Sequence, residues 1–316
     1  MTDSFRKIDY RLRPAKHAER AMLIELVKRL RFCPTENYQY VGMGSVAFID
    51  HRMMHRHTGI ADMVSFEGTD DATIQERFRR NVPLSCVRME FGMSTAILPT
   101  LDFTRQSVVW LDYDDTLQRS MVNDIETVGR TVADGSFVAA TFATSFPTDA
   151  EKRPVELARL RNEFPEYVSE ETKPGEMEGG GLASLGRRAF GDLLAKAVSD
   201  ADAGIAPDQK RRVKQVCYFR YRDGALMCTL GWVIISDRTE AAFEQSNLPA
   251  LPFYKTGEQA FDIRIPKVTP YEVREMERRL PDIAEHAELS WIPPSDRTAF
   301  AAIYRFLPTF GVFEPV

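Results

Sequence analysis

The sequence predicts an α/β fold with a doubly wound, mostly parallel β-sheet. Strand-like and helix-like segments alternate from residue 38 to residue 144, which is the pattern of a parallel sheet with helices on both faces. Two of the strand segments, 108–111 and 137–142, are continuously apolar, as strands buried on both faces tend to be. Further along, two β-rich segments meet at Asp223 and Gly224, a pair that favours an antiparallel hairpin. We therefore expect parallel strands followed by a C-terminal hairpin.

The first half of the chain supplies the parallel strands. Residues 14–30 carry apolar side chains at helical spacing after a proline suited to a first turn, so they predict an amphipathic helix. A long helix is expected over 115–135, and Asp115 and Gln118 have the spacing of a capping box at its start. The expected strands cover 38–44, 62–68, 86–92, 107–114 and 136–144, and the helices between them cover 46–58, 70–80 and 95–101.

The second half departs from this alternation. Residues from about 146 to 212 are charged and helical in pattern, with a glycine-rich loop at 179–181, and we expect a helical insertion facing the substrate. Residues 1–245 are expected to form one core that includes this insertion and an N-terminal helical cap at 1–34. The remaining residues, 246–316, are expected to form an extension packed on the core.

Composition narrows the classes of protein that the chain can represent. It has 316 residues, 44% of them hydrophobic, which is enough for a sizeable globular core. The net charge of -5 argues against binding nucleic acid through the overall field. The start lacks the apolar segment of a signal peptide, and no run approaches the roughly 18 apolar residues of a membrane span. We expect a cytoplasmic protein with no membrane partner.

The segment "YVGMGS" is the first candidate for a binding site. Gly42 and Gly44 follow a short strand and precede a helix, where a ligand can approach the backbone and meet unpaired N–H groups. Glu67 ends the next strand, 23 residues after Gly44, where an acid can accept hydrogen bonds from both hydroxyls of a ribose. The same letters, Gly42 to Ala47, also fit the GxGxxA pattern of NAD-dependent enzymes, which leaves a dehydrogenase open.

Parallel strands, a glycine turn and a final hairpin resemble the class I S-adenosylmethionine-dependent methyltransferases. The resemblance implies that Gly42, Gly44 and Ser45 form the turn under the cofactor and that Glu67 binds its ribose. The sequence differs from the usual first motif at Tyr40, where an acid is common, and at Val46, where a third glycine is common. Another group must then meet the cofactor ammonium.

The third and fourth strand ends extend this resemblance. "EFGMS" is similar to the adenine-binding stretch of small-molecule O-methyltransferases, which implies cofactor contacts from Gly92 and Ser94, while Met93 replaces the usual acid. In "LDYDD", Asp112 occupies the position nearest the reacting methyl group, where a carboxylate can orient or deprotonate the acceptor or face the sulfonium. Asp114 is open between a catalytic role and a structural one.

The ordered set "RPAKHAER", "YVGMGS", "SFEGTDD", "EFGMS" and "WLDYDDTL" also resembles a bacterial family described as putative O-methyltransferases. The resemblance spans residues 11–144. It implies S-adenosylmethionine as cofactor and methyl transfer to oxygen by in-line displacement. It does not identify the acceptor or the oligomeric state, although a small molecule is favoured.

The helix over 14–30 carries further candidates. His17 and Glu19 could reach the site, and Glu19 could replace the acid missing at position 40, whereas Arg13 and Lys16 are expected on a solvated basic face. His51 and His55 are four residues apart, but they lack the glutamate of HExxH, and we expect helix packing and no metal.

Three other functions stay open at this point. One is an NAD-dependent oxidoreductase, and another is a methyltransferase acting on nucleic acid, with "LDYD" in the catalytic position. The aromatics and arginines of residues 218–222 could stack on bases and contact phosphates, but strand alternation with one face buried and the arginines exposed explains them more simply. The third is a non-catalytic nucleotide-sensing subunit, for which the altered residue Tyr40 leaves room.

Overall fold

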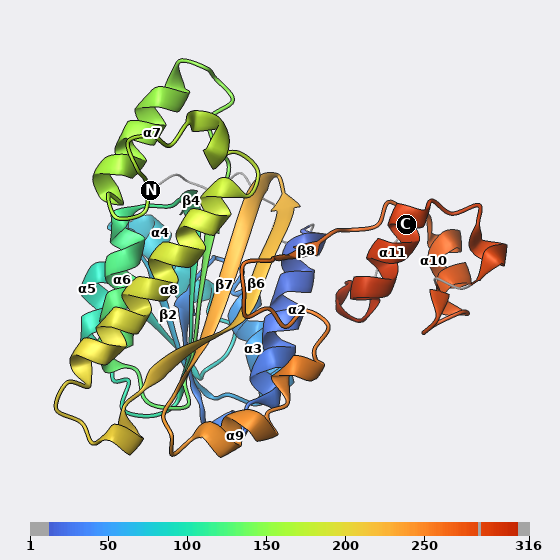
Figure 1. The fold of residues 1–316 in the computed structure, drawn as a ribbon. Coiled ribbons are helices and arrows are strands. Elements are labelled where there is room, and N and C mark those ends of the chain that lie inside the picture. The colour runs from blue at the N-terminus through green and yellow to red at the C-terminus, as the bar shows by residue number, and fades with distance from the viewer. Residues whose placement is uncertain (1–12, 284–285, 309–316) are drawn as a thin grey trace.

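The computed structural model describes residues 13–283 and 286–308, and its centre is an eight-stranded sheet of order β3-β2-β1-β4-β5-β7-β6-β8 (Figure 1). The strands are β1 (Gln39–Met43), β2 (Asp62–Glu67), β3 (Val87–Phe91), β4 (Ser107–Thr116), β5 (Phe137–Ala143), β6 (Arg212–Asp223), β7 (Ala225–Ile235) and β8 (Phe261–Ile263). Strands β1 to β5 are parallel, and β7 runs antiparallel to both β5 and β6. The predicted doubly wound sheet with a final hairpin is confirmed.

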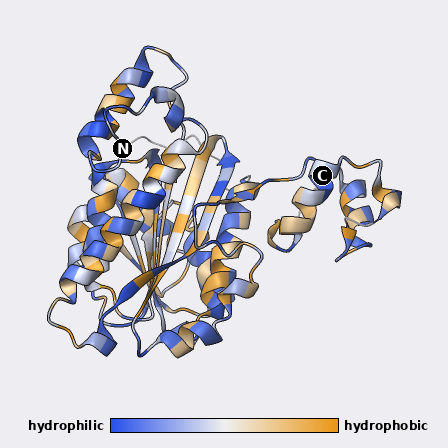
Figure 2. Ribbon diagram, viewed as in Figure 1, coloured by the Kyte–Doolittle hydropathy of each residue, from blue (hydrophilic) through white to orange (hydrophobic). Residues whose placement is uncertain are grey.

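Helices cover both faces of the sheet. The α-helices of the described residues, including two that lie away from the sheet, are α2 (Pro14–Arg29), α3 (Ile49–Thr58), α4 (Ala72–Asn81), α5 (Ser94–Ile97), α6 (Arg119–Thr131), α7 (Lys152–Glu163), α8 (Gly181–Ala201), α9 (Glu240–Gln245), α10 (Pro270–Glu277) and α11 (Pro294–Ile303). One apolar core lies between the sheet and α2 with α3, and the other lies between the sheet and α6 with α8. Figure 2 shows hydrophobic residues along the central strands between these layers.

Side chains along β4 point alternately into the two apolar cores on either side of the sheet. Val108 and Trp110 belong to the core under α2, whereas Val109 and Leu111 belong to the core under α6. Because successive side chains of a strand point to opposite faces, an uninterrupted apolar run is required wherever both faces are covered. β5 is buried along its whole length for the same reason.

The hairpin turns within one residue. Asp223 at the end of β6 pairs with Ala225 at the start of β7, and Gly224 between them has a φ of 88°. Glycine adopts this left-handed backbone without the steric cost that a Cβ would bring. Tyr218, Phe219 and Tyr221 of β6 are buried, so the aromatics that could have stacked on bases belong to the core.

Two expectations for the middle of the chain are wrong in detail. Asp115 does not cap a helix, because β4 continues to Thr116 after an irregularity in its pairing with β5. α6 begins only at Arg119, and its N-cap Gln118 makes no side-chain capping bond. The glycines expected in a loop instead lead into α8, whose first residue is Gly181 and which packs along α6 as part of the layer over the sheet.

The extension after residue 245 has two parts. Phe253 is buried in the core under α2, and β8 pairs in parallel with β6, so the chain up to Ile263 lies on the sheet. Beyond it, α10, α11 and the turns between them bury a small apolar cluster of their own and project from the core (Figure 1). The 3-10 turn Tyr304–Phe306 brings the chain back, where the Phe306 and Phe253 rings lie 5.3 Å apart. The parts of the expected cap and extension at 1–12 and 309–316 lie outside the described residues.

Candidate functional site

A cleft of about 1020 Å³ opens at the carboxyl ends of β1, β2, β3 and β4. This edge is where open α/β sheets bind ligands, because the loops that leave the strands spread apart there. The sequence-predicted residues that line it are Gly44, Ser45, Glu67, Gly92, Ser94, Asp112 and Asp114. These residues lie at or just after the ends of four different strands, and the parallel sheet places those strand ends side by side.

The turn after β1 forms the floor of the cleft. The Gly44 N–H donates to the carbonyl of Phe66 at 3.0 Å, which ties the turn to the end of β2. A Cβ on Gly44 would collide with the Ser65 hydroxyl, which would have to move to make room for it. The turn then bends through Phe48, whose φ of 49° is unusual for a residue with a side chain. Among the described residues, no group bonds the buried Ser45 Oγ, which leaves a polar atom for a ligand.

Glu67 stands at the end of β2 as expected. Burial raises its pKa to about 7, with a further contribution from the negative charge of Asp114, against a hydrogen bond from the Gly68 backbone that lowers it. Loss of the proton makes this carboxyl a better acceptor for paired hydroxyls, because both of its oxygens can then accept.

The exit of β3 is held by an acid that the sequence reasoning missed. Asp124 of α6 accepts hydrogen bonds from the Ser94 hydroxyl at 2.5 Å and from the Tyr113 hydroxyl at 2.8 Å. Burial raises the pKa of Asp124, although both hydrogen bonds oppose that shift. These bonds fix the Ser94 side chain at the wall of the cleft.

Asp112 lies at the end of the regular part of β4, beside a buried lysine. Lys16 Nζ donates to Asp112 Oδ1 at 2.6 Å and pairs with Glu19 Oε2 at 2.7 Å. The expectation that Lys16 and Arg13 lie on a solvated face is wrong, since the Lys16 side chain is 1% exposed and the Arg13 side chain 10%. Burial raises the pKa of Asp112, the Lys16 cation opposes that shift, and Asp50 adds to it.

Three predicted site residues do not line the cleft. Gly42 lies inside β1, where a Cβ would come 2.8 Å from the Tyr40 hydroxyl. Glu19 is fully buried beneath Asp112 and reaches it only through Lys16. His17 is half-buried, and burial, with help from the Arg20 and His57 charges, lowers its pKa. The structure therefore places His17 and Glu19 outside direct contact with a ligand in the cleft.

Lys16 and Asp124, the two residues that the sequence did not reveal, share one feature: each is a charged residue on a helix face that packs against the sheet and is buried by it. Lys16 precedes the apolar positions of α2 by six residues, and a lysine there reads as solvated from spacing alone. The sequence signal that could have found it is its i, i+3 pairing with Glu19.

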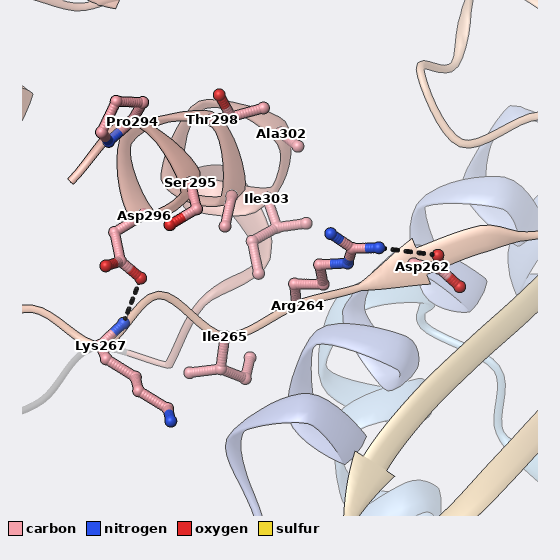
Figure 3. Close-up of a pocket in the computed structure, with 11 residues that line it drawn as sticks. Asp262, Arg264, Ile265, Lys267, Pro294, Ser295, Asp296, Thr298, Ala302 and Ile303 are labelled. Atoms are coloured by element: carbon pink, nitrogen blue, oxygen red, sulfur yellow. Dashed lines mark hydrogen bonds and ion pairs between the residues drawn. The ribbon is translucent and has the colours of Figure 1, made fainter.

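A second hollow, of about 680 Å³, lies between α11 and the segment after β8, and it contains none of the predicted site residues (Figure 3). Arg264 pairs there with Asp262, and Asp296 accepts the backbone N–H of Lys267 at 2.9 Å. In the described part of the chain, no three acidic, histidine or cysteine residues are grouped to hold a metal ion. The described helices include none with the length and apolar character to span a bilayer.

The chain matches a known protein family over almost its whole length. Residues 8–315 match the family described as "Putative O-methyltransferase". The chain belongs to this family. The resemblance seen in its ordered motifs is thereby confirmed, and the protein is a methyltransferase with the sheet expected of that class. No protein of curated function matches the sequence.

Solved structures that match are remote. Trm1 from Pyrococcus horikoshii, in complex with S-adenosyl-L-methionine, is 12% identical over 72% of this chain and 57% of that chain, with a TM-score of 0.44. A protein from Klebsiella pneumoniae described as a putative O-methyltransferase is 13% identical over 69% of this chain and 79% of its own, with a TM-score of 0.38. LepI, solved with SAH and a substrate analogue, is 10% identical over 66% of this chain, with a TM-score of 0.38, and this chain spans 46% of the LepI chain.

Proposed function

We propose that this methyltransferase uses S-adenosylmethionine and transfers its methyl group to an oxygen atom of a small molecule. Membership of the O-methyltransferase family supports the reaction class. The observation that carries the cofactor assignment is that Gly44, Glu67 and Asp112 line one cleft at the carboxyl edge of the sheet. These positions provide a close backbone approach, an acceptor for ribose hydroxyls and a carboxylate beside the reaction centre.

The residues present fit such a cofactor. The Gly44 turn leaves no Cβ in the way, and the buried Ser45 hydroxyl offers an unused hydrogen-bonding group. Glu67 would hold the ribose, while Gly92 and Ser94 at the exit of β3 would lie against the adenine. Bound there, the cofactor supplies an electrophilic methyl group with a neutral thioether as leaving group. The rest of the cleft is wide enough for a small acceptor.

Asp112 is the residue proposed to act on the acceptor. Its Oδ1 is held by Lys16, and its side chain keeps 23% exposure at the cleft. The carboxylate can therefore orient an acceptor hydroxyl and take its proton as oxygen becomes the nucleophile. Asp114 is exposed at the cleft wall, and we assign it to the electrostatics of the site through its effect on the pKa of Glu67.

Ligand-dependent unfolding tests the cofactor assignment. S-adenosylhomocysteine at 100 times its dissociation constant should stabilise the protein by about 2.7 kcal/mol, whereas NAD at the same concentration should not. The variant Glu67→Gln should lose most of this shift, and Glu171→Gln, an exposed change on the insertion, should keep it. Stabilisation by NAD alone would return the dehydrogenase as the better assignment. Salt-dependent binding of RNA or DNA would instead favour a nucleic-acid acceptor.

The same proposal assigns roles to the parts of the chain. Residues 1–245 form the cofactor-binding core, with the cap and the insertion included, and residues 246–316 form the extension. The segment between β5 and α8 stands over the carboxyl edge of the sheet in Figure 1, where it would shape the acceptor pocket. A nucleotide-sensing role without catalysis would be favoured if the cofactor bound but no methyl transfer to any hydroxylated compound were found.

A further inference from the structure

Five ionisable side chains form a buried cluster beneath the cleft. They are Lys16, Glu19 and Arg20 of α2, Asp50 of α3 and Asp112 of β4. All but Asp112 are nearly or fully buried. Asp112 alone, 23% exposed, connects the cluster to the cleft.

Lys16 saturates its ammonium group inside this cluster. Its three protons face Asp112 Oδ1 at 2.6 Å, Glu19 Oε2 at 2.7 Å and the Tyr221 hydroxyl at 3.2 Å. The Trp110 ring, 4.7 Å from Nζ, adds a cation–π contact. Arg20 meanwhile pairs with Asp50 at 2.5 Å. Each of the two basic side chains therefore has an acidic partner inside the cluster.

The charges in this cluster do not balance. It holds two cations and three carboxylates, so full ionisation leaves one uncompensated negative charge in a cluster of which only Asp112 reaches the cleft. Burying an unpaired charge is costly, and a group in that position gains a proton instead. Burial raises the pKa of both Glu19 and Asp112.

The hydrogen bonds around Glu19 Oε1 lack one proton, which a protonated Glu19 would supply. Glu19 Oε1 contacts the hydroxyls of Thr141 and Thr229, and these hydroxyls lie 2.8 Å from each other. The two hydroxyls supply only two protons for three contacts. A proton on Glu19 Oε1 would complete the ring, whereas Oε2 is already occupied by Lys16 and by the Tyr221 hydroxyl at 3.1 Å.

Within residues 13–283 and 286–308, no further charge beside the cluster cancels this excess. The other titratable or charged groups that act on Glu19, Asp112 and their partners are Arg13 before α2, Tyr40 on β1, His51 on α3, Asp114 on β4, Cys217 and Tyr221 on β6 and Cys228 on β7. Arg13 is paired with Asp223, and burial raises the pKa of each tyrosine and cysteine in this set, which keeps them neutral. Burial lowers the pKa of His51 to about 4, so it is neutral too.

We propose that the cluster of Lys16, Glu19, Arg20, Asp50 and Asp112 holds one exchangeable proton and releases it when a cationic cofactor occupies the cleft beside Asp112. This inference rests on the proposed function, because the sulfonium of S-adenosylmethionine supplies the compensating positive charge. S-adenosylhomocysteine lacks that charge and leaves the proton in place. The sulfonium then balances the charge of the deprotonated cluster, whereas the retained proton balances it when S-adenosylhomocysteine is bound. Lys16 and Glu19 are thereby positioning residues that set the ionisation of Asp112.

Calorimetry of cofactor binding tests the proposal without an acceptor. The binding enthalpies of S-adenosylmethionine and S-adenosylhomocysteine are measured at about pH 7.5 in buffers of different ionisation enthalpy, such as phosphate and Tris. The dependence on buffer gives the number of protons released, and it should be larger by about one for S-adenosylmethionine. Protons released from Glu67 by ribose binding appear with both ligands and cancel in the difference.

Two variants separate this effect from a structural one. Glu19→Gln removes the surplus carboxylate and should abolish the difference in proton release between the two ligands. Asp202→Asn changes a buried acid that pairs with Arg211 instead, and it should keep the difference. If Glu19→Gln does not fold, the wild-type comparison still decides. Equal proton release by both ligands in the wild type overturns the inference alone, whereas failure of both to bind overturns the proposed function as well.

Discussion

Replacing Glu67 by glutamine should stabilise the cofactor-free protein while removing a cofactor contact. Burial raises the pKa of the Glu67 carboxyl from 4.5 to about 7, so ionisation costs more in the folded protein than in the unfolded chain. At 1.36 kcal/mol per pKa unit, the charged form destabilises the fold by about 3 kcal/mol. Glutamine keeps the shape of the side chain and carries no charge, so Glu67→Gln removes this cost.

The sign of this effect depends on pH. The folded protein binds the Glu67 proton more tightly than the unfolded chain, so the wild type loses stability as pH rises from 4.5 to about 7. Below that window the carboxyl is neutral in both states. Glu67→Gln should therefore match the wild type near pH 4, and it should exceed the wild type by up to about 3 kcal/mol above pH 7.

Chemical denaturation at several pH values measures this difference directly. The matched control is Glu171→Gln, an exposed change that should stay within about 0.5 kcal/mol of the wild type at every pH. Wild-type affinity for S-adenosylhomocysteine should also increase as pH rises through about 7, because the ionised carboxylate is the better acceptor for ribose hydroxyls. A stability difference that is the same at low and high pH would refute the reasoning.

Two further substitutions test the floor of the cleft and the cluster beneath it. Lys16→Met leaves Glu19 and Asp112 without their shared cation. Denaturation curves should show a loss of stability of about 3–5 kcal/mol near neutral pH and a smaller loss in acid. A loss below about 1 kcal/mol would contradict the pairing. Gly44→Ala forces a Cβ against the Ser65 hydroxyl, and it should cost about 1–3 kcal/mol and weaken S-adenosylhomocysteine binding in titrations. Gly204→Ala, with open space around it, is the control, and normal binding by Gly44→Ala would argue against a cofactor at this turn.

The sheet could be predicted from the sequence because its strands carry their burial in their composition. The apolar runs of β4 and β5 and the Asp223–Gly224 turn each depend on local chemistry, and the structure has them where the sequence indicated. The start of α6 could not be found in this way. A favourable capping pattern at Asp115 was overridden by continued pairing of β4 with β5 up to Thr116, which is a tertiary effect.

The site was predictable where it depends on strand ends and not where it depends on burial of a helix face. Gly44, Glu67, Asp112 and their neighbours follow directly from the ends of successive parallel strands, which must share one edge. The surroundings of Lys16 do not follow from sequence spacing, because its partners Asp112 and Tyr221 lie 96 and 205 residues away along the chain. Only the fold brings these groups within hydrogen-bonding distance.

The segment from Lys255 to Ile263 covers the outer edge of β6 and so protects the sheet from pairing with strands of other molecules. β6 would otherwise be an outer strand with a free row of backbone groups, and such a row can recruit a strand from another molecule. Instead the backbone N–H of Lys255 donates to the carbonyl of Val216 at 3.1 Å, and the Gln215 side-chain amide donates to the carbonyls of Lys255 and Gly257. β8 then pairs with Phe219–Tyr221. A shortened chain that ends before this segment would expose the backbone edge of β6 and would tend to aggregate, whether or not its cofactor cleft is intact.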